Sequence, residues 1–164
     1  MTHMEGNSLL FLKIRSGSIE EAASDLRNRP EVTQVYPLLG HWDMVVSVNI
    51  PEYESLRGFS DMVEERPYCE RASFYPCFEQ WERETPSEAP ITGWAMIRTT
   101  KTEETFKRLQ EYEQVYWMTQ TGGDYNIVIH VGAKELNDLS RFITSEIHSI
   151  PGVRRTETYP SPSK

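Results

Sequence analysis

The 164-residue chain has few cysteines and no long apolar run. Cys69 and Cys77 are too far apart for CxxC redox or zinc chemistry, so we expect two ordinary reduced thiols. No segment approaches the roughly 18 consecutive apolar residues of a membrane-spanning helix, and the polar start from Met1 to Ser8 lacks the core of a signal peptide. We therefore expect a cytoplasmic protein that has no membrane partner.

Positive charge is also scarce. The formal net charge is −8, and no run of Lys and Arg is longer than Arg154-Arg155. Proteins that bind phosphate backbones carry basic clusters, so direct binding of nucleic acid is not expected. The sequence shows no Gly-rich phosphate loop, no HExxH motif and no Ser/His/Asp pattern, and His41 and His148 have no ligand spacing. We expect no cofactor and no metal, and the sequence favours a binding protein over an enzyme.

What the sequence does contain is an internal repeat. An ungapped comparison of residues 11–59 with residues 94–142 gives twelve identities. Such self-similarity at a fixed spacing predicts two copies of one small fold, and joined copies can pair with each other as a pseudo-dimer. The identical pairs are Ile14/Ile97, Arg15/Arg98, Glu20/Glu103, Glu21/Glu104, Leu26/Leu109, Val32/Val115, Gly40/Gly123, Val45/Val128, Val48/Val131, Glu52/Glu135, Leu56/Leu139 and Phe59/Phe142.

Within each copy the hydrophobic period changes in the order βαββαβ. This order predicts an α+β protein made of two tandem ferredoxin-like units, of the dimeric α+β barrel type. We place the first unit at residues 8–80, a polar, Pro-bearing linker at 81–90, and the second unit at 91–160. The expected elements are strand 10–14, helix 19–26, strands 32–39 and 43–50, helix 53–63 and strand 71–78, then strand 91–99, helix 103–112, hairpin 114–131, helix 134–149 and strand 153–159.

The two faces of the predicted strands differ in character. Met44, Val46 and Val48 form an apolar face that should lie under the helices. The opposite face is mixed, and it carries Phe11 in the first copy and Trp94 in the second. Bare aromatic surface is unfavourable, so we expect each mixed face to pack on the sister copy.

One pattern resembles a known family. In the first copy it consists of Pro30-Glu31-Val32, Val35-Tyr36, Gly40 and the run from Trp42 to Val48, and in the second of Ile150-Pro151-Gly152-Val153. Together these residues resemble the effector-binding domain of the Lrp/AsnC, or feast/famine, transcription regulators. Members typically carry a helix-turn-helix ahead of one such domain. Because the first strand here begins by Leu9, the resemblance implies a tandem effector-binding protein that has no helix-turn-helix.

The resemblance also implies a binding site. In the family, small effectors, usually amino acids, bind where dimers meet, close to the turn between the second and third strands. This implies amino-acid binding, regulation of transcription, and assembly as a homo-oligomer or with related regulators. Carried over to this sequence, the site residues are Gly40, His41, Trp42 and Asp43 in the first copy and Gly123, Asp124, Tyr125 and Asn126 in the second.

The chemistry of these turns agrees with such a site. Glycine permits close backbone approach, Asp43 can accept a hydrogen bond from an ammonium group, and Trp42 offers an apolar wall. The competing interpretation is that Gly40 only closes the hairpin while Asp43 caps it. In the second copy, the ungapped alignment places Asn126 at the position of Asp43, whereas a shift of one residue keeps an acid in Asp124. Either way, the two turns are not equivalent.

An enzyme remains the alternative hypothesis. Small monooxygenases are dimeric α+β barrels, and siroheme decarboxylases resemble the Lrp/AsnC fold itself; these enzymes use His, Trp, Arg or Asn between sheet and helices. Arg15, Arg98, His130 and Trp94 on the mixed face mark a corresponding alternative cavity. The competing interpretation is that these side chains have purely structural roles. An adaptor whose turns bind other subunits is a third possibility.

Overall fold

The computed structural model describes residues 6–84 and 88–162. The chain divides into two compact units, Met1–Cys77 and Phe78–Lys164. Residues 85–87 of the predicted linker lie outside the described residues. The predicted packing of the two copies as a pseudo-dimer stays a prediction.

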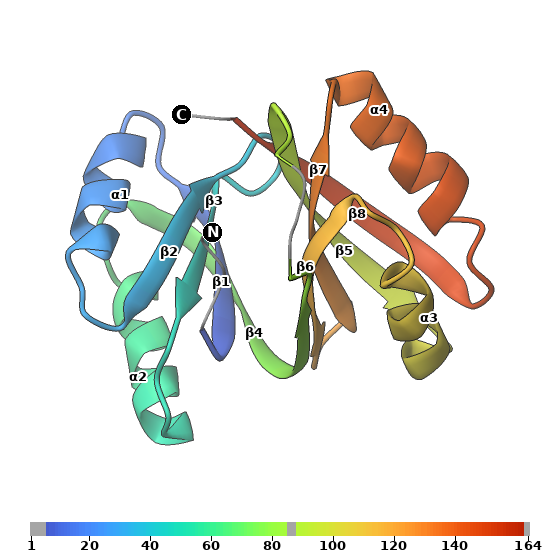
Figure 1. Ribbon diagram of the computed structural model, residues 1–164. Helices are drawn as coiled ribbons and strands as arrows, with labels where there is room; N and C mark the ends of the chain where they lie inside the picture. Colours follow the sequence, from blue (N-terminus) through green and yellow to red (C-terminus); the bar gives the residue numbers. More distant parts are fainter. Residues whose placement is uncertain (1–5, 85–87, 163–164) are drawn as a thin grey trace. The chain divides into compact units, whose positions relative to one another are not determined.

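The first unit is a four-stranded antiparallel sheet in the order β2-β3-β1-β4. Helices α1 and α2 lie on one face of this sheet (Figure 1). This is the predicted ferredoxin-like arrangement. Its elements are β1 (Ser8–Ile14), α1 (Ile19–Arg27), β2 (Val32–Pro37), β3 (Met44–Val48), α2 (Tyr53–Glu64) and β4 (Cys69–Glu82).

The second unit repeats this topology, with the strand order β6-β7-β5-β8. Helices α3 and α4 again lie on one face of the sheet (Figure 1). The α+β fold class is therefore confirmed for both copies. The elements are β5 (Ile91–Thr99), α3 (Thr102–Leu109), β6 (Val115–Thr121), β7 (Ile127–Ala133), α4 (Leu136–Arg141), a π-helical segment (Phe142–Ile147) and β8 (Val153–Ser161).

Each unit has its own core between helices and sheet. In the first unit, the predicted inner face of β3 packs in one cluster with Leu26 of α1 and Phe59 of α2. In the second, the inner face of β7 packs with Leu109 of α3 and Phe142. Each fully buried side chain of this size contributes roughly 1.5–3 kcal/mol, so these clusters hold the helices on the sheets. The inner faces consist of Met44, Val46 and Val48 in β3 and Ile127, Ile129 and Val131 in β7.

The first strands of the two units do not follow the ungapped alignment. Leu12 lies opposite Met44 in the first unit, and Ile97 lies opposite Ile127 in the second. The counterparts Met44 and Ile127 are separated by 83 positions, but Leu12 and Ile97 are separated by 85. The connection between β1 and α1 is therefore two residues longer than the one between β5 and α3.

This register corrects the sequence alignment at the first strand. The ungapped pairs Ile14/Ile97 and Arg15/Arg98 are wrong as structural equivalents. Arg98 lies opposite Arg155, and the residue in the matching place of the first unit is Lys13, opposite Arg71. Twelve identities remain in the sequence, but the two at the first strand do not share a position in the fold.

A second difference lies in the last helix of the second unit. The segment Phe142–Ile147 is π-helical, and the amide of His148 donates to the carbonyl of Ile143, five residues earlier. The matching helix α2 is α-helical throughout. Val63 and Ile147, both fully buried, take the same place near the ends of these helices. The π-helical segment thus accommodates one extra residue without moving the buried side chains that flank it.

No helix among the described residues is long and apolar enough to cross a membrane. Strand β4 is longer than predicted, because it runs from Cys69 to Glu82 rather than from 71 to 78. Beyond the strand, the amide of Arg83 donates to the carbonyl of Tyr116 at 2.8 Å. The last residues of β4 and Arg83 thus belong to the second unit.

Two glycines with open space around them give a matched test of the backbone. Gly17 has φ of +85° and Gly58 lies within α2, and a Cβ at either position would meet no atom within 4 Å. We expect Gly58→Ala to raise the unfolding free energy by about 0.5–1 kcal/mol, because Ala favours a helix. Gly17→Ala should lower it by about 1–2 kcal/mol through left-handed strain. Urea unfolding measures both, and changes of the same sign would contradict this backbone assignment.

Candidate functional site

The turns that were predicted to bind ligand have the same backbone geometry in both units. Gly40 has φ of +129° and Gly123 has φ of +142°, values that favour glycine. Three residues after each glycine, a backbone amide donates a hydrogen bond to the first strand of its unit. The amide of Asp43 donates to the carbonyl of Leu12 at 2.8 Å, and that of Asn126 donates to Ile97 at 3.0 Å. Asn126, and not Asp124, therefore takes the place of Asp43.

The side chains at this position bind the end of the first strand. Oδ2 of Asp43 accepts a hydrogen bond from the amide of Ile14 at 2.7 Å. Oδ1 of Asn126 accepts one from the amide of Thr99 at 3.0 Å. The amide group of Asn126 also donates to the carbonyl of Thr99 and to Oγ1 of Thr102. Both residues thus cap a strand end, and this capping role was one of the two interpretations of Asp43.

An arginine from the last strand of each unit stacks on the aromatic ring of the turn. The guanidinium carbon of Arg71 lies 5.0 Å from the ring centre of Trp42, and that of Arg155 lies 5.4 Å from Tyr125. Both rings are buried, at 7% and 4% exposure. Such cation–π contacts hold a charged group beside the turn. Sequence reasoning missed both arginines, whose equivalence follows from the register of β4 and β8.

The turn of the second unit carries a denser polar network. Nη2 of Arg155 donates to the hydroxyl of Tyr125 at 2.8 Å, and that hydroxyl donates to Glu157. Arg98 donates to the carbonyl of Asp124 at 3.2 Å. Burial, and then the neighbouring Glu157 carboxylate, raise the pKa of Tyr125. The phenol therefore stays protonated, and it is held between a cation and an anion.

The first turn has a simpler polar environment. His41 is exposed, its Nε2 lies in hydrogen-bond contact with Nη2 of Arg71, and its ring meets Trp42 edge-on at 5.3 Å. Trp42 in turn lies 6.3 Å from the ring of Phe11 in β1. A cation, an imidazole and an indole are therefore gathered beside Asp43.

The residues predicted for the alternative cavity lie in three different environments. Arg15 is exposed directly after β1, where its amide donates to the carbonyl of Tyr68. Arg98 is exposed and contacts the turn of the second unit. Trp94 and His130 lie opposite each other in β5 and β7, with stacked rings 4.5 Å apart. Within the second unit, His130 thus contacts Trp94, whereas Arg98 contacts the turn.

His130 lies among further aromatic rings. Tyr116 meets it edge-on at 6.1 Å, and Trp117 lies 6.0 Å from Trp94. Removal from water lowers the pKa of His130 to about 4, so its imidazole is neutral near pH 7. At the matching position of β3 the first unit has Ser47. The aromatic cluster around a histidine is therefore a property of the second unit.

Metal-binding groups are not gathered anywhere in residues 6–84 and 88–162. No three His, Cys, Asp or Glu side chains in this part of the chain are arranged to hold a metal ion. Cys69 and Cys77 are both free thiols. The polar groups at the turns are thus arranged for hydrogen bonds and charge pairing.

Comparison with known proteins identifies the second unit. Residues 95–163 match the profile of the family described as the Lrp/AsnC ligand binding domain. The second unit is an Lrp/AsnC ligand-binding domain. The match includes the whole turn and its arginine and confirms the resemblance seen in the sequence. Within this Lrp/AsnC domain, Gly123 to Asn126 form the β6–β7 turn.

Relatives with curated names extend beyond the part that this chain matches. HTH-type transcriptional regulator FL11 of Pyrococcus furiosus is 38% identical over 56 residues, which are 34% of this chain and 37% of that regulator. The match thus spans little more than a third of the relative's length. Part of this chain is thus similar to part of a transcriptional regulator.

Two solved structures resemble the whole chain in fold. The siroheme decarboxylase NirDL, in co-complex with an iron-uroporphyrin III analogue, is 11% identical with a TM-score of 0.77, over 95% of this chain and 70% of that one. A putative monooxygenase of Fusobacterium nucleatum is 6% identical with a TM-score of 0.56, over 97% and 93%. At such identities the likeness shows the fold alone.

The capping role of Asp43 gives a stability prediction. Asp43→Ala removes the acceptor of the Ile14 amide, and we expect it to lower the unfolding free energy by about 1–3 kcal/mol. Asp43→Asn keeps an acceptor oxygen, as Asn126 does in the second unit, and should cost less than about 1 kcal/mol. Urea denaturation measures the unfolding free energy of both variants. Equal decreases would show that the bond to Ile14 does not hold the turn.

His130 gives a prediction about pH. An unfolded histidine titrates near pH 6.5, whereas His130 titrates at about 4 in the folded protein. As the pH falls from 6.5 to 4, only the unfolded chain gains this proton, so the unfolding free energy should fall by up to about 3 kcal/mol. His130→Asn removes this contribution. Unfolding at pH 7 and at pH 4.5 should show a smaller decline in the variant, and the same decline in both proteins would contradict the assignment.

Proposed function

We propose that this protein is a ligand-sensing regulatory protein that binds a small zwitterionic metabolite, most simply an amino acid, at its turns. It acts in the cytoplasm through a homo-oligomer or through assembly with related regulators, without binding DNA itself. The family of the second unit supports the ligand-sensing role. The amino-acid ligand, the mode of assembly and the absence of a DNA-binding domain are parts of the proposal.

One observation carries the proposal: both turns place a charged arginine on a buried aromatic ring beside a capped strand end. A ligand carboxylate pairs with a guanidinium, and a ligand ammonium pairs with a carboxylate. In the first unit these partners are Arg71 and Asp43, which still has one carboxylate oxygen besides the one bound to Ile14. The two charges of a zwitterion thus meet two opposite charges.

The two turns differ in charge, so they should differ in affinity. Asn126 is neutral and its side chain already makes three hydrogen bonds to backbone and hydroxyl groups. In the second unit, the carboxylate of Glu157 beside the turn is bound to Tyr125. A ligand ammonium group would have to compete with Tyr125 for that carboxylate. We therefore propose the turn of the first unit as the tighter site.

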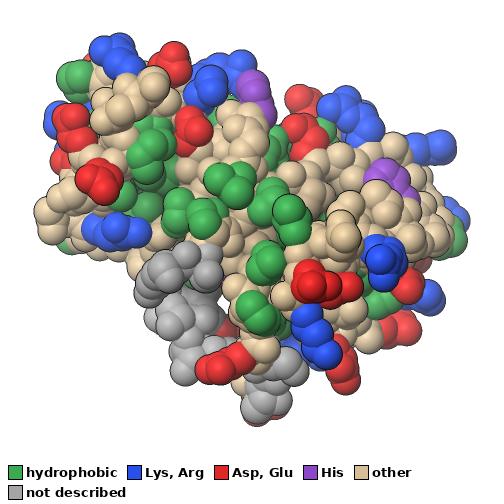
Figure 2. All heavy atoms as spheres, turned by 90° about the horizontal axis from the view of Figure 1, so that it is seen from above, with side chains coloured by type: hydrophobic (Ala, Val, Ile, Leu, Met, Phe, Trp, Pro, Cys, Tyr) green, Lys and Arg blue, Asp and Glu red, His purple; other side chains and the backbone are tan. Residues whose placement is uncertain are grey.

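The distribution of surface charge supports a role without direct DNA contact. On the face drawn in Figure 2, Lys and Arg side chains are interspersed with Asp and Glu and form no continuous basic area. The net charge of −8 adds an overall repulsion from phosphate backbones. Any effect on transcription would then pass through a partner protein.

The experiment begins with a thermal-shift screen of amino acids, nucleotides and porphyrins. A ligand at about 100 times its Kd adds roughly 2.7 kcal/mol to the unfolding free energy, which such a screen detects. With the amino acid that it identifies, Asp43→Asn should weaken binding by about ten- to hundredfold in calorimetry, because a charged partner of the ammonium group is lost. The capping bond survives in this variant, so the fold is retained.

The reciprocal change is the control. Asn126→Asp introduces the missing charge at the second turn and should not weaken binding. Unchanged affinity in Asp43→Asn would move the site away from this turn. Stabilisation by porphyrins alone, with no response to any amino acid, would contradict the proposal and favour the enzyme hypothesis.

A further inference from the structure

The second unit contains a hollow far from its turn. The hollow has a volume of about 880 Å³, within the range of small-molecule sites. It lies at the end of β7, whereas the β6–β7 turn precedes the first residue of that strand, so the two are roughly 20 Å apart. Its lining residues are Glu88, Ala89, Glu111, Tyr112, Glu113, Gln114, Tyr116, Gly132, Ala133, Lys134, Asp138, Arg141, Phe142, Ser145 and Glu146.

A difference between the two copies contributes to the hollow in the second unit. The amide of Asn49 donates to Glu31 in the first unit, and that of Gly132 donates to Gln114 in the second, so Asn49 and Gly132 are counterparts. The next residues are therefore Ile50 and Ala133. Ile50 is only 6% exposed and belongs to the core, whereas Ala133 has three carbon atoms fewer and lines the hollow. Smaller side chains thus leave space that the first unit fills.

An arginine holds the loop that forms one wall. The guanidinium group of Arg83 donates to the carbonyls of Gln110, Tyr112 and Val115, at 2.9, 2.6 and 3.0 Å. These bonds join the C-cap residue of α3, Gln110, to the first residue of β6, Val115. The ring of Tyr112 then meets Phe142 edge-on at 5.2 Å. The loop is therefore fixed, and it presents an apolar wall.

The opposite wall is partly π-helical. Phe142, Ser145 and Glu146 belong to the π-helical segment and line the hollow. Single π-helical turns are rare and occur frequently at functional sites. The matching helix α2 is regular, so the π-helical backbone beside this hollow is particular to the second unit. This is a second difference between the copies at the same place.

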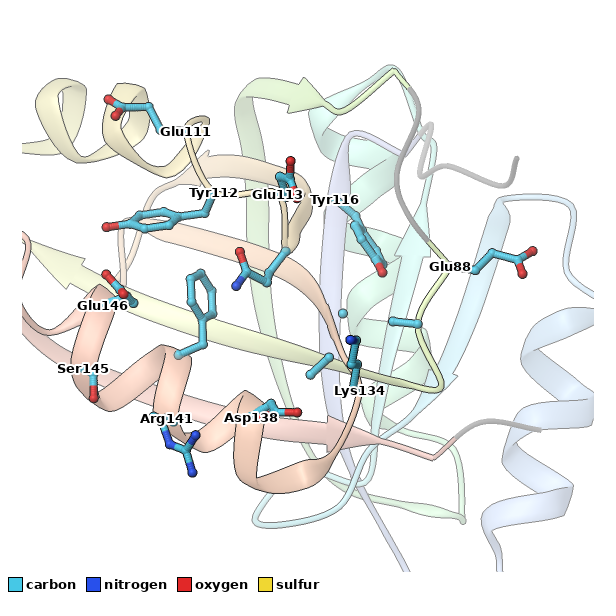
Figure 3. A pocket seen from close by; sticks show the side chains of 15 residues that line it. Glu88, Glu111, Tyr112, Glu113, Tyr116, Lys134, Asp138, Arg141, Ser145 and Glu146 are labelled. Carbon is cyan, nitrogen blue, oxygen red and sulfur yellow. The ribbon is translucent and has the colours of Figure 1, made fainter.

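Seven charged residues line the hollow, and two of them, Asp138 and Lys134, have opposite charges. Figure 3 shows the carboxylate of Asp138 directed to the side on which Lys134 lies, with the ring of Tyr112 across the hollow. Glu88 and Glu111 point away from it (Figure 3). Among the described residues, neither Asp138 nor Lys134 has a side-chain hydrogen bond or ion pair. Their counterparts in the first unit, Ser55 and Pro51, carry no charge.

We propose that this hollow is a second ligand site, specific to the second unit, for a small zwitterion with an apolar or aromatic side chain. Asp138 binds the ammonium group, Lys134 binds the anionic group, and the rings of Tyr112 and Phe142 contact the side chain. This site is separate from the proposed turn site, and evidence against one of them is not evidence against the other. Its existence depends on residues that differ between the copies.

The test uses calorimetry with three related probes in an Asp43→Asn background, in which the tighter of the two proposed turn sites is weakened. L-phenylalanine carries both charges, phenethylamine only the ammonium group, and 3-phenylpropionate only the carboxylate. We expect L-phenylalanine to bind and each analogue to bind at least about tenfold more weakly, because each loses one charged partner. No binding of L-phenylalanine, or equal binding of phenethylamine, would overturn the proposal.

Variants then locate the binding. Ala133→Ile restores the side chain of the first unit and should weaken binding by narrowing the hollow beside Lys134. Lys134 is exposed, so Lys134→Gln keeps the fold and should weaken L-phenylalanine at least about tenfold without affecting phenethylamine. Glu111→Gln, whose side chain points away from the hollow (Figure 3), is the matched control and should change nothing. Affinity that is unchanged in both Ala133→Ile and Lys134→Gln would overturn the site.

Discussion

A hydrogen bond to the first strand of the unit holds each candidate turn, β2–β3 in the first unit and β6–β7 in the second. In both units a side-chain oxygen at the start of the third strand accepts from an amide at the end of the first, that of Ile14 or of Thr99. This bond, with the left-handed glycine before it, determines where the aromatic residue of the turn lies. The arginine of the last strand then stacks on that ring. Four elements of each unit thus converge on one capped turn.

The copies share their cores and differ where an extra residue can be absorbed. The additional residues lie in the connection between β1 and α1 of the first unit and in the π-helical segment of the second. Neither position moves the buried cluster between helices and sheet. Cores resist changes in volume, whereas loops and helix ends accept them. The aromatic cluster around His130 and the hollow at the end of β7 are features of the second unit on this shared scaffold.

Most of the fold follows from hydrophobic period and turn residues, but the first strand shows the limit of such patterns. In a strand, residues two apart share a face, so pairing Ile14 with Ile97 keeps every apolar residue on the correct side although the register is shifted by two. The strand register and the hydrogen bonds of Asp43 and Asn126 distinguish the alternatives. The same bonds settle which residue of the second turn replaces Asp43.

The candidate sites were less accessible from the sequence. The turns were predicted from a resemblance, but Arg71 and Arg155 lie some 30 residues from their rings, and no local pattern connects them. The π-helical segment leaves no periodic signal, since one inserted residue in a short amphipathic helix looks like ordinary variation. One difference at the hollow, Ala133 in place of the buried Ile50, acquires meaning only when the two units are compared in space.

The central claim is that ligands bind where the two copies have diverged, at the turns and at the end of β7. Backbone amide shifts in two-dimensional NMR, recorded during titration with a stabilising amino acid, test it most directly. We predict two separate groups of shifted amides, one around Gly40 to Asp43 and one around residues 111–116 and 132–146. Shifts that lie outside both groups, for example along the inner face of β3 and helix α2, would contradict the account.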